Sequence, residues 1–151
     1  MKGPDDMKLL PTGIENFKTI IDKKAYYVDK TNLIADVLNE QVALYTRPRR
    51  FGKTLNMSMF YYFFSNKEKE NSYLFDDLNI SKNEEAIKHQ NQYPTIFISL
   101  KEMKNPTFEE QIATFKDIVK NVVLQNKELL ESSYVDESDQ IILQDFRFLR
   151  S

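Results

Sequence analysis

The sequence of 151 residues predicts an α/β fold with a mostly parallel sheet flanked by helices. Two segments, Val42–Thr46 and Thr95–Leu100, are uninterrupted runs of β-favouring residues, the pattern of strands that are covered on both faces. Helical patterns separate the two runs, as expected where crossover helices join parallel strands. We expect these runs to be the central strands of a sheet that is incomplete in this chain.

The composition predicts one domain in the cytoplasm. With 41% apolar residues and a net charge of −2, the chain can bury a sizeable core and does not suit a protein whose whole surface binds polyanions. The absence of cysteine and the single histidine exclude disulfides, a thiolate nucleophile and multi-histidine metal sites. The longest apolar stretch, Met57–Phe64, falls far short of the roughly 18 residues of a membrane span. We therefore expect no membrane partner.

Short elements precede the first predicted strand. Pro11–Gly13 is a turn signal, and Ala25–Val28 predicts a short strand. Thr31 is positioned to cap a helix. Two helical faces are expected, formed by Ile14, Phe17, Ile20 and Ile21 and by Leu33, Ile34, Val37 and Leu38.

Further helices are expected after the first predicted strand. Leu55–Phe64 is apolar nearly all round, which indicates a buried helix. The segments 81–84 and 107–110 fit capping boxes, the first opening a short helix and the second a long one. A last helix is expected over about residues 140–149, whereas 65–93 is polar and gives few signals.

A basic loop between the first predicted strand and the buried helix ends in Gly52-Lys53-Thr54, the last three positions of a P-loop. The glycine lets the backbone approach a phosphate closely, and the lysine places an ammonium group at the outer phosphates. The threonine hydroxyl is a suitable ligand for Mg²⁺. A helix that begins here also directs unpaired amides and its positive dipole end at the anion.

The loop departs from the P-loop pattern at its beginning. Arg47 replaces the first glycine, and Pro48 lacks a backbone N–H donor. Arg49 and Arg50 can compensate with forked donors to phosphate. Together with Lys53 these residues give the octet four positive charges and no negative one, which indicates a polyanionic ligand.

The run Arg47-Pro48-Arg49-Arg50-Phe51-Gly52-Lys53-Thr54-Leu55 resembles the Walker A variant R-P-R-R-F-G-K-[ST]-L of the bacterial AAA-ATPase-like family. Residues 10–14, with Phe17, and residues 27–31 resemble the N-terminal part of that family at similar spacing. The resemblance implies a P-loop NTPase-like fold, with 1–40 as an N-terminal extension and 41–151 as a fragment of the P-loop core. Many members carry a C-terminal domain resembling a PD-(D/E)XK nuclease, through which nucleic acid would be a partner.

The motif and the resemblance together predict binding of ATP with Mg²⁺. Lys53 is the candidate catalytic residue and Thr54 the candidate metal ligand. The residues expected to contact the nucleotide are Arg49, Arg50, Phe51, Gly52, Lys53, Thr54 and Leu55.

Hydrolysis by this chain is expected to be weak or absent. A Walker B acid should follow a hydrophobic strand, but Thr95–Leu100 is followed by Lys101. Asp76 and Asp145 lie after apolar residues in segments that suit a loop or a helix better. The sequence thus leaves open whether the chain is an enzyme.

Other functions remain as alternatives. The basic loop 47–53 also suits a non-enzymatic module that binds nucleic acid or protein, or a degenerate P-loop that serves as a scaffold. A truncated sheet has an exposed edge, so we expect self-association. Structural rather than functional roles are favoured for three remaining features. These are a solvated loop or helix-end residue for His89, a turn or cap for Asp76-Asp77 and core packing for the aromatic run 61–64.

Overall fold

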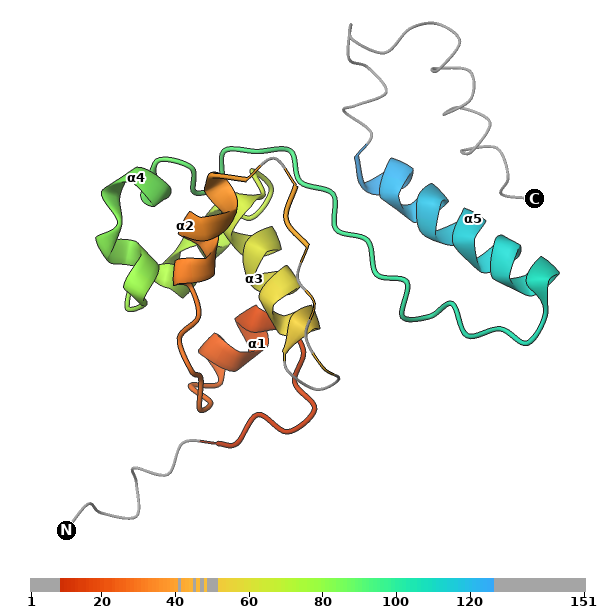
Figure 1. Ribbon diagram of the computed structural model, residues 1–151, viewed down its shortest axis with the longest axis horizontal. Coiled ribbons are helices and arrows are strands. Elements are labelled where there is room, and N and C mark those ends of the chain that lie inside the picture. The colour runs from red at the N-terminus through yellow and green to blue at the C-terminus, as the bar shows by residue number, and fades with distance from the viewer. Residues whose placement is uncertain (1–8, 41, 45, 47, 49–51, 127–151) are drawn as a thin grey trace, which may run out of the picture. The chain divides into compact units, whose positions relative to one another are not determined.

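The computed structural model describes residues 9–40, 42–44, 46, 48 and 52–126, in two compact units that divide between Thr95 and Ile96 (Figure 1). The first unit holds the α-helices α1 (Phe17–Asp22), α2 (Asn32–Leu38), α3 (Lys53–Phe64) and α4 (Glu84–Ile87) and the 3-10 helices η2 (Lys69–Phe75) and η3 (Asn79–Lys82). The second unit holds α5 (Phe108–Gln125). The predicted division into 1–40 and 41–151 stays a prediction.

The predicted parallel sheet is wrong for the part of the chain that the structure describes. This part contains helices and no β-strand, and its one isolated parallel bridge joins Ser65 to Tyr93. Val42 and Leu44 are each 86% exposed, where a covered central strand would bury them. Apolar β-favouring side chains indicate an extended backbone, but a strand also needs a hydrogen-bonded neighbour.

The second run predicted to be a strand differs in the same way. Residues 94–100 have no regular secondary structure, and Ile96 and Leu100 are about half exposed, at 50% and 56%. The short strand expected over residues 25–28 is also absent from the structure. Ala25 is buried there and Tyr27 packs against the core, but Tyr26 and Val28 are exposed, so the segment packs through alternate side chains without forming a β-strand.

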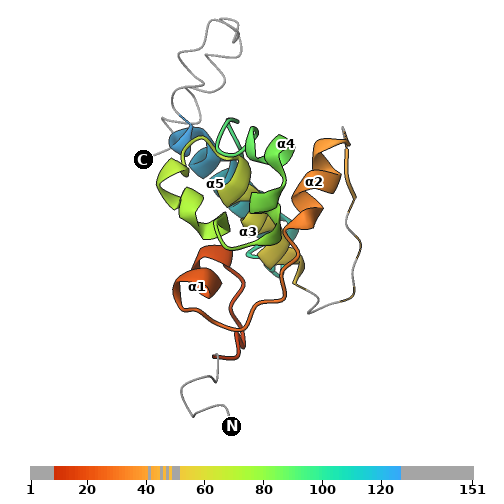
Figure 2. The ribbon, with the colours of Figure 1, turned by 90° about the vertical axis from the view of Figure 1, so that its left-hand side faces the viewer.

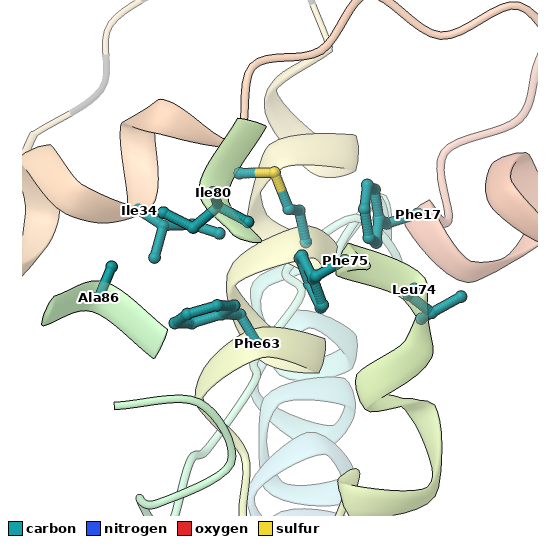
Figure 3. Close-up of a cluster of buried hydrophobic side chains, with 8 residues drawn as sticks. Phe17, Ile34, Phe63, Leu74, Phe75, Ile80 and Ala86 are labelled. Atoms are coloured by element: carbon teal, nitrogen blue, oxygen red, sulfur yellow. The ribbon is translucent and has the colours of Figure 1, made fainter. Parts of the chain in front are cut away.

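The core of the first unit is a cluster of side chains contributed by every one of its named helices (Figure 3). Phe75 lies at its centre, with ring centroids 5.1 Å from both Phe17 and Phe63. The full set of buried members is Phe17, Ile34, Met59, Phe63, Leu74, Phe75, Ile80 and Ala86. Burial of Met59 and Phe63 confirms the predicted buried helix, although Met57 at its other side is 48% exposed.

A loop residue far along the chain completes the C-terminal end of α3. The last carbonyl groups of a helix lack partners within the helix. The Asn91 amide N–H donates to the Phe63 carbonyl at 2.7 Å, and its side-chain Nδ2 donates to the carbonyls of Tyr62 and Ser65. Asn91 is buried and has a φ of 54°, a left-handed conformation that asparagine tolerates better than most residues. It anchors the segment 88–93, which the sequence pattern left unassigned.

Five predicted helices are confirmed in the described residues, but only one begins at its predicted cap. The Thr107 hydroxyl accepts from the Glu110 amide at 3.3 Å and begins α5 as expected. In α4 the side chain of Asn83 accepts from the Ala86 amide, so the cap lies two residues after the predicted Ser81 and the helix begins at Glu84. The side chain of Asn16 caps α1. The helix expected over 140–149 lies outside the described residues.

Thr31 precedes α2, but its side chain makes no cap hydrogen bond. Its hydroxyl donates to Asp29 Oδ1 at 2.7 Å and accepts from the Ile80 amide at 3.1 Å. The other Asp29 oxygen, Oδ2, accepts from the Asn79 amide at 2.7 Å. Asp29 and Thr31 therefore fasten the start of α2 to the start of η3, and Figure 2 shows α2 beside α4, which follows η3.

The second unit is described by itself. Helix α5 has 18 residues, none of them buried, and Phe108 at its start is 74% exposed. Asn105 joins the preceding loop to the helix, because its Nδ2 donates to the Glu110 carbonyl at 2.9 Å and to the Thr114 hydroxyl. Neither this helix nor any other in the described ranges combines the length and apolar content needed to cross a membrane.

Candidate functional site

The candidate site lies at the N-terminus of α3. Gly52 is the N-cap residue and adopts φ +75°, a left-handed conformation that strains any side-chain-bearing residue. The first backbone bond of the helix runs from the Asn56 amide to the Gly52 carbonyl at 2.9 Å. The amides of the three residues before Asn56 therefore lack a helical acceptor, and they point out of the helix start with the positive end of its dipole.

An open pocket of about 700 Å³ lies beside this helix start. Its volume falls within the roughly 300 to 1,000 Å³ of small-molecule and cofactor sites. One wall is formed by Gly52, Lys53, Thr54 and Leu55, and the other by Ile20 and the segment Pro11–Glu15. A Cβ built on Gly52 meets nothing within 4 Å, so the space in front of this backbone is open to a ligand.

The second wall is a turn with its own hydrogen bonds. The Ile14 amide donates to the Pro11 carbonyl at 3.2 Å, which confirms the predicted turn. Gly13 adopts φ +76°, the conformation that favours glycine at the third position of a type II turn. Before the turn, the Leu9 carbonyl accepts from the Tyr26 amide at 2.8 Å, so the segment is held at both ends.

Ser58 on α3 joins the two walls. Its Oγ accepts from the Phe17 amide at 2.9 Å and donates to the Leu55 carbonyl at 2.8 Å, with the Glu15 carbonyl oxygen 3.4 Å away. The Phe17 amide is the first of α1 and has no acceptor within its own helix, so a side chain from α3 supplies one. Ser58 is itself buried, at 7% exposure. The hydroxyl thus fixes the position of the turn relative to the start of α3.

The structure brings together part of the predicted site. Gly52, Lys53, Thr54 and Leu55 line one wall of the pocket, with the side chains of Lys53 and Thr54 exposed. The predicted contacts from Arg49, Arg50 and Phe51 lie outside the described residues, as does Arg47 of the basic loop. The nucleotide and metal roles of all these residues stay predictions.

Sequence reasoning missed the second wall and the serine that positions it. The sequence predicts a turn at Pro11–Gly13 and a family resemblance over residues 10–14, but nothing in their spacing from Gly52 predicts a shared pocket. Ser58 had no signal of its own, because a serine inside an apolar helix pattern gives no indication of a partner 41 residues away. The one signal in the sequence that connects the two walls is that residues 10–14 and the basic loop both resemble the same family.

Three features were predicted to have structural rather than functional roles, and their surroundings agree with this prediction. Phe63 belongs to the core, Asp76 is the C-cap residue of η2, and His89 lies just after the end of α4, where its amide donates to the Ala86 carbonyl at 3.0 Å. Among the described residues, no group of three or more His, Cys, Asp or Glu side chains is arranged to hold a metal ion.

Comparison with known proteins identifies one family. The model of the AAA-ATPase-like family, described as predicted AAA-ATPases, matches residues 11–147. No curated protein and no solved structure matches the chain. The matched region includes both walls of the pocket and extends over most of the 151 residues. The chain therefore belongs to the AAA-ATPase-like family.

Proposed function

We propose that this chain binds ATP together with Mg²⁺ in the pocket at the start of α3, with the triphosphate against Gly52, Lys53, Thr54 and Leu55. The observation that carries the proposal is the coincidence of a G-K-T motif, a helix start and an open pocket of about 700 Å³. Membership of the AAA-ATPase-like family supports nucleotide binding in general. Arg49, Arg50 and Phe51, adjacent in sequence, are proposed to add contacts.

The chemistry of this wall suits a triphosphate. Amides at a helix start and the helix dipole stabilise an anion, and an exposed ammonium group at Lys53 adds a full positive charge. The open space in front of Gly52 permits the close backbone approach that phosphate binding requires. In this proposal the phosphate end of the nucleotide lies against four consecutive residues at the start of α3, Gly52–Leu55.

The donors at the pocket also suit Mg²⁺, which prefers oxygen ligands and commonly keeps several waters beside substrate phosphates. The Thr54 hydroxyl would hold the ion on the protein side, and the phosphate oxygens of ATP would complete its shell. The ion would neutralise part of the triphosphate charge. Hydrolysis is not part of the proposal, and the expectation that it is weak or absent in this chain stands.

The basic composition of residues 47–53 favours one rival, a nucleic-acid contact, and salt dependence separates the two. We expect calorimetric titration to show Mg²⁺-dependent ATP binding that weakens less than about tenfold between 50 and 200 mM salt. A nucleic-acid site with 6 to 10 phosphate contacts loses about 10³ to 10⁵ in affinity over that range. Steeply salt-dependent binding of a 20-nucleotide single strand, without ATP binding, would establish the rival.

A further inference from the structure

The pocket has two chemically different walls. The wall from the start of α3 carries the ammonium group of Lys53 and the hydroxyl of Thr54, whereas the described residues of the opposite wall include no cation. That wall contributes the apolar side chains of Pro11, Ile14 and Ile20 beside Thr12, Gly13 and Glu15. Small-molecule sites generally combine a mostly apolar lining with a few placed polar groups. A triphosphate uses only the first wall, because phosphate oxygens gain nothing from contact with apolar carbon.

We propose that the turn Pro11–Glu15 is the nucleoside wall of this pocket, and that Ser58 is the positioning residue that holds it across from the start of α3. The inference rests on the proposed function and extends it from phosphate binding to recognition of the nucleoside. The ligand class is a nucleoside triphosphate rather than an inorganic polyphosphate.

Ser58 lies between the two walls and contacts both of them. One hydroxyl contacts three backbone groups, the Leu55 carbonyl on the phosphate wall, the Phe17 amide at the start of α1 and the Glu15 carbonyl at the end of the turn. A second side-chain bond joins the cap of α1 to α3, from Asn16 Nδ2 to the hydroxyl of Tyr62 at 3.2 Å, and Tyr62 lies about two helical turns beyond Leu55. Loss of the Ser58 hydroxyl therefore frees the turn near the pocket and leaves the far end of the contact in place.

The turn itself faces the pocket and is open to a ligand. Ile14 is half-buried and lines the pocket, so part of its side chain is available to the flat face of a base or to the ribose. Gly13 has no atom within 4 Å of a built Cβ, so the tip of the turn is open. The turn is restrained at both sides, through Tyr26 before it and Ser58 after it. Such a wall is pre-organised, which lowers the entropic cost of binding.

The test compares Mg²⁺-ATP with Mg²⁺-tripolyphosphate as ligands of the same 151-residue chain. The wild-type protein should bind ATP more tightly than tripolyphosphate. Ser58→Ala should weaken ATP binding roughly five- to tenfold and change tripolyphosphate binding less than twofold. Ser81→Ala is the matched control, because the Ser81 hydroxyl donates to the Leu78 carbonyl at 2.7 Å, the same local bond at a site outside the pocket. Ser81→Ala should leave the affinities for ATP and for tripolyphosphate unchanged.

A second variant avoids dependence on the buried serine. Ile14→Ala trims the turn without removing a hydrogen bond and should weaken ATP binding about three- to tenfold, again without effect on tripolyphosphate. Ile87→Ala, the same change at a partly buried position of α4 outside the pocket, is its control and should leave ATP binding unchanged.

The outcomes separate the inference from the proposed function. Equal wild-type affinity for the two ligands, or equal losses for both ligands in Ser58→Ala and Ile14→Ala, would overturn the nucleoside wall and leave the phosphate site standing. Unchanged ATP affinity in both variants would also overturn it. Failure of the wild-type protein to bind either ligand would refute the proposed function, and the inference with it.

Discussion

Replacing Lys53 with alanine is expected to cause the largest loss of nucleotide binding of any single substitution in this chain. Lys53 is exposed at the first position of α3 and lines the pocket. Removing its ammonium group deletes a charge-assisted hydrogen bond to phosphate, of about 1.5 to 3 kcal/mol, which corresponds to roughly 10- to 150-fold in Kd. Titration calorimetry with ATP and Mg²⁺ measures the change.

Lys69→Ala provides the control for Lys53→Ala. Lys69 is also an exposed lysine at the first position of a helix, η2, but it is not part of the pocket lining. The two variants have the same net charge, so any general electrostatic effect on an anionic ligand is common to both. An equal reduction of ATP affinity in both variants would show that Lys53 acts through overall charge, which contradicts a specific phosphate contact.

Asp29→Asn is expected to have the second-largest effect, on stability. The substitution removes the negative charge and replaces one acceptor oxygen with an amide donor. Either the Asn79 amide or the Thr31 groups then lose their acceptor, and the others keep only a neutral one. We expect the free energy of unfolding to fall by about 1 to 2 kcal/mol at pH 7, as is usual for loss of a hydrogen bond to a charged group. Urea unfolding followed by circular dichroism measures this change.

The Asp29 effect should depend on pH. Burial by itself raises the pKa of Asp29, but hydrogen bonds from Thr31 and Asn79 and the positive charge of Lys82 outweigh burial, so the pKa lies below its ordinary value of 3.8. A carboxylate with a depressed pKa in the folded state stabilises that state fully above its ordinary pKa. The contribution is lost as the pH falls through the folded-state pKa. The stability difference between wild type and Asp29→Asn should therefore shrink below about pH 4.

Asp36→Asn is the control for this pH dependence. Asp36 is an exposed residue of α2, close in sequence to Asp29 but outside its hydrogen-bond network. It should leave the free energy of unfolding within about 0.5 kcal/mol of wild type. A stability difference for Asp29→Asn that is as large at pH 3 as at pH 7 would show that the carboxylate charge has no part in joining α2 to η3.

Local signals in the sequence predicted the helices well, because helices form from contacts between residues close in the chain. The apolar spacing around Phe17, the dense apolar run of α3 and the Thr107 capping box all identified real helices. Their caps were less predictable. Thr31 has the right residue type for an N-cap, yet its hydroxyl bonds to Asp29 and the Ile80 amide, a choice set by η3 rather than by α2.

The sheet could not be judged from local signals. A strand depends on partners distant in the sequence, and the runs around Val42 and Ile96 carry the side-chain preference without a paired neighbour in the described residues. The candidate site likewise has one part that local sequence predicts and one part that it does not. Gly52, Lys53 and Thr54 were found from a contiguous motif, whereas the turn at Gly13 reaches the pocket only through tertiary contacts made by Ser58.

The segment 27–31, which resembles the family but suggested no chemistry, has a structural explanation. Asp29 and Thr31 bind the backbone of η3, and Tyr27 packs its ring edge-on against Phe17 with centroids 5.6 Å apart. The first contacts join the start of α2 to η3, and the second joins this segment to α1. The segment thus contributes to the framework that positions α1 and α3, and through them the two walls of the pocket.

Amide chemical shifts recorded by NMR during titration with Mg²⁺-ATP test the central claim most directly, because that claim concerns backbone N–H groups at the start of α3. The largest changes are expected at Lys53, Thr54 and Leu55, with smaller ones at Gly13 and Ile14. The amides of α5 should not shift. Saturable ATP binding that shifts amides elsewhere and leaves those of Lys53, Thr54 and Leu55 unmoved would contradict a phosphate site at this helix start.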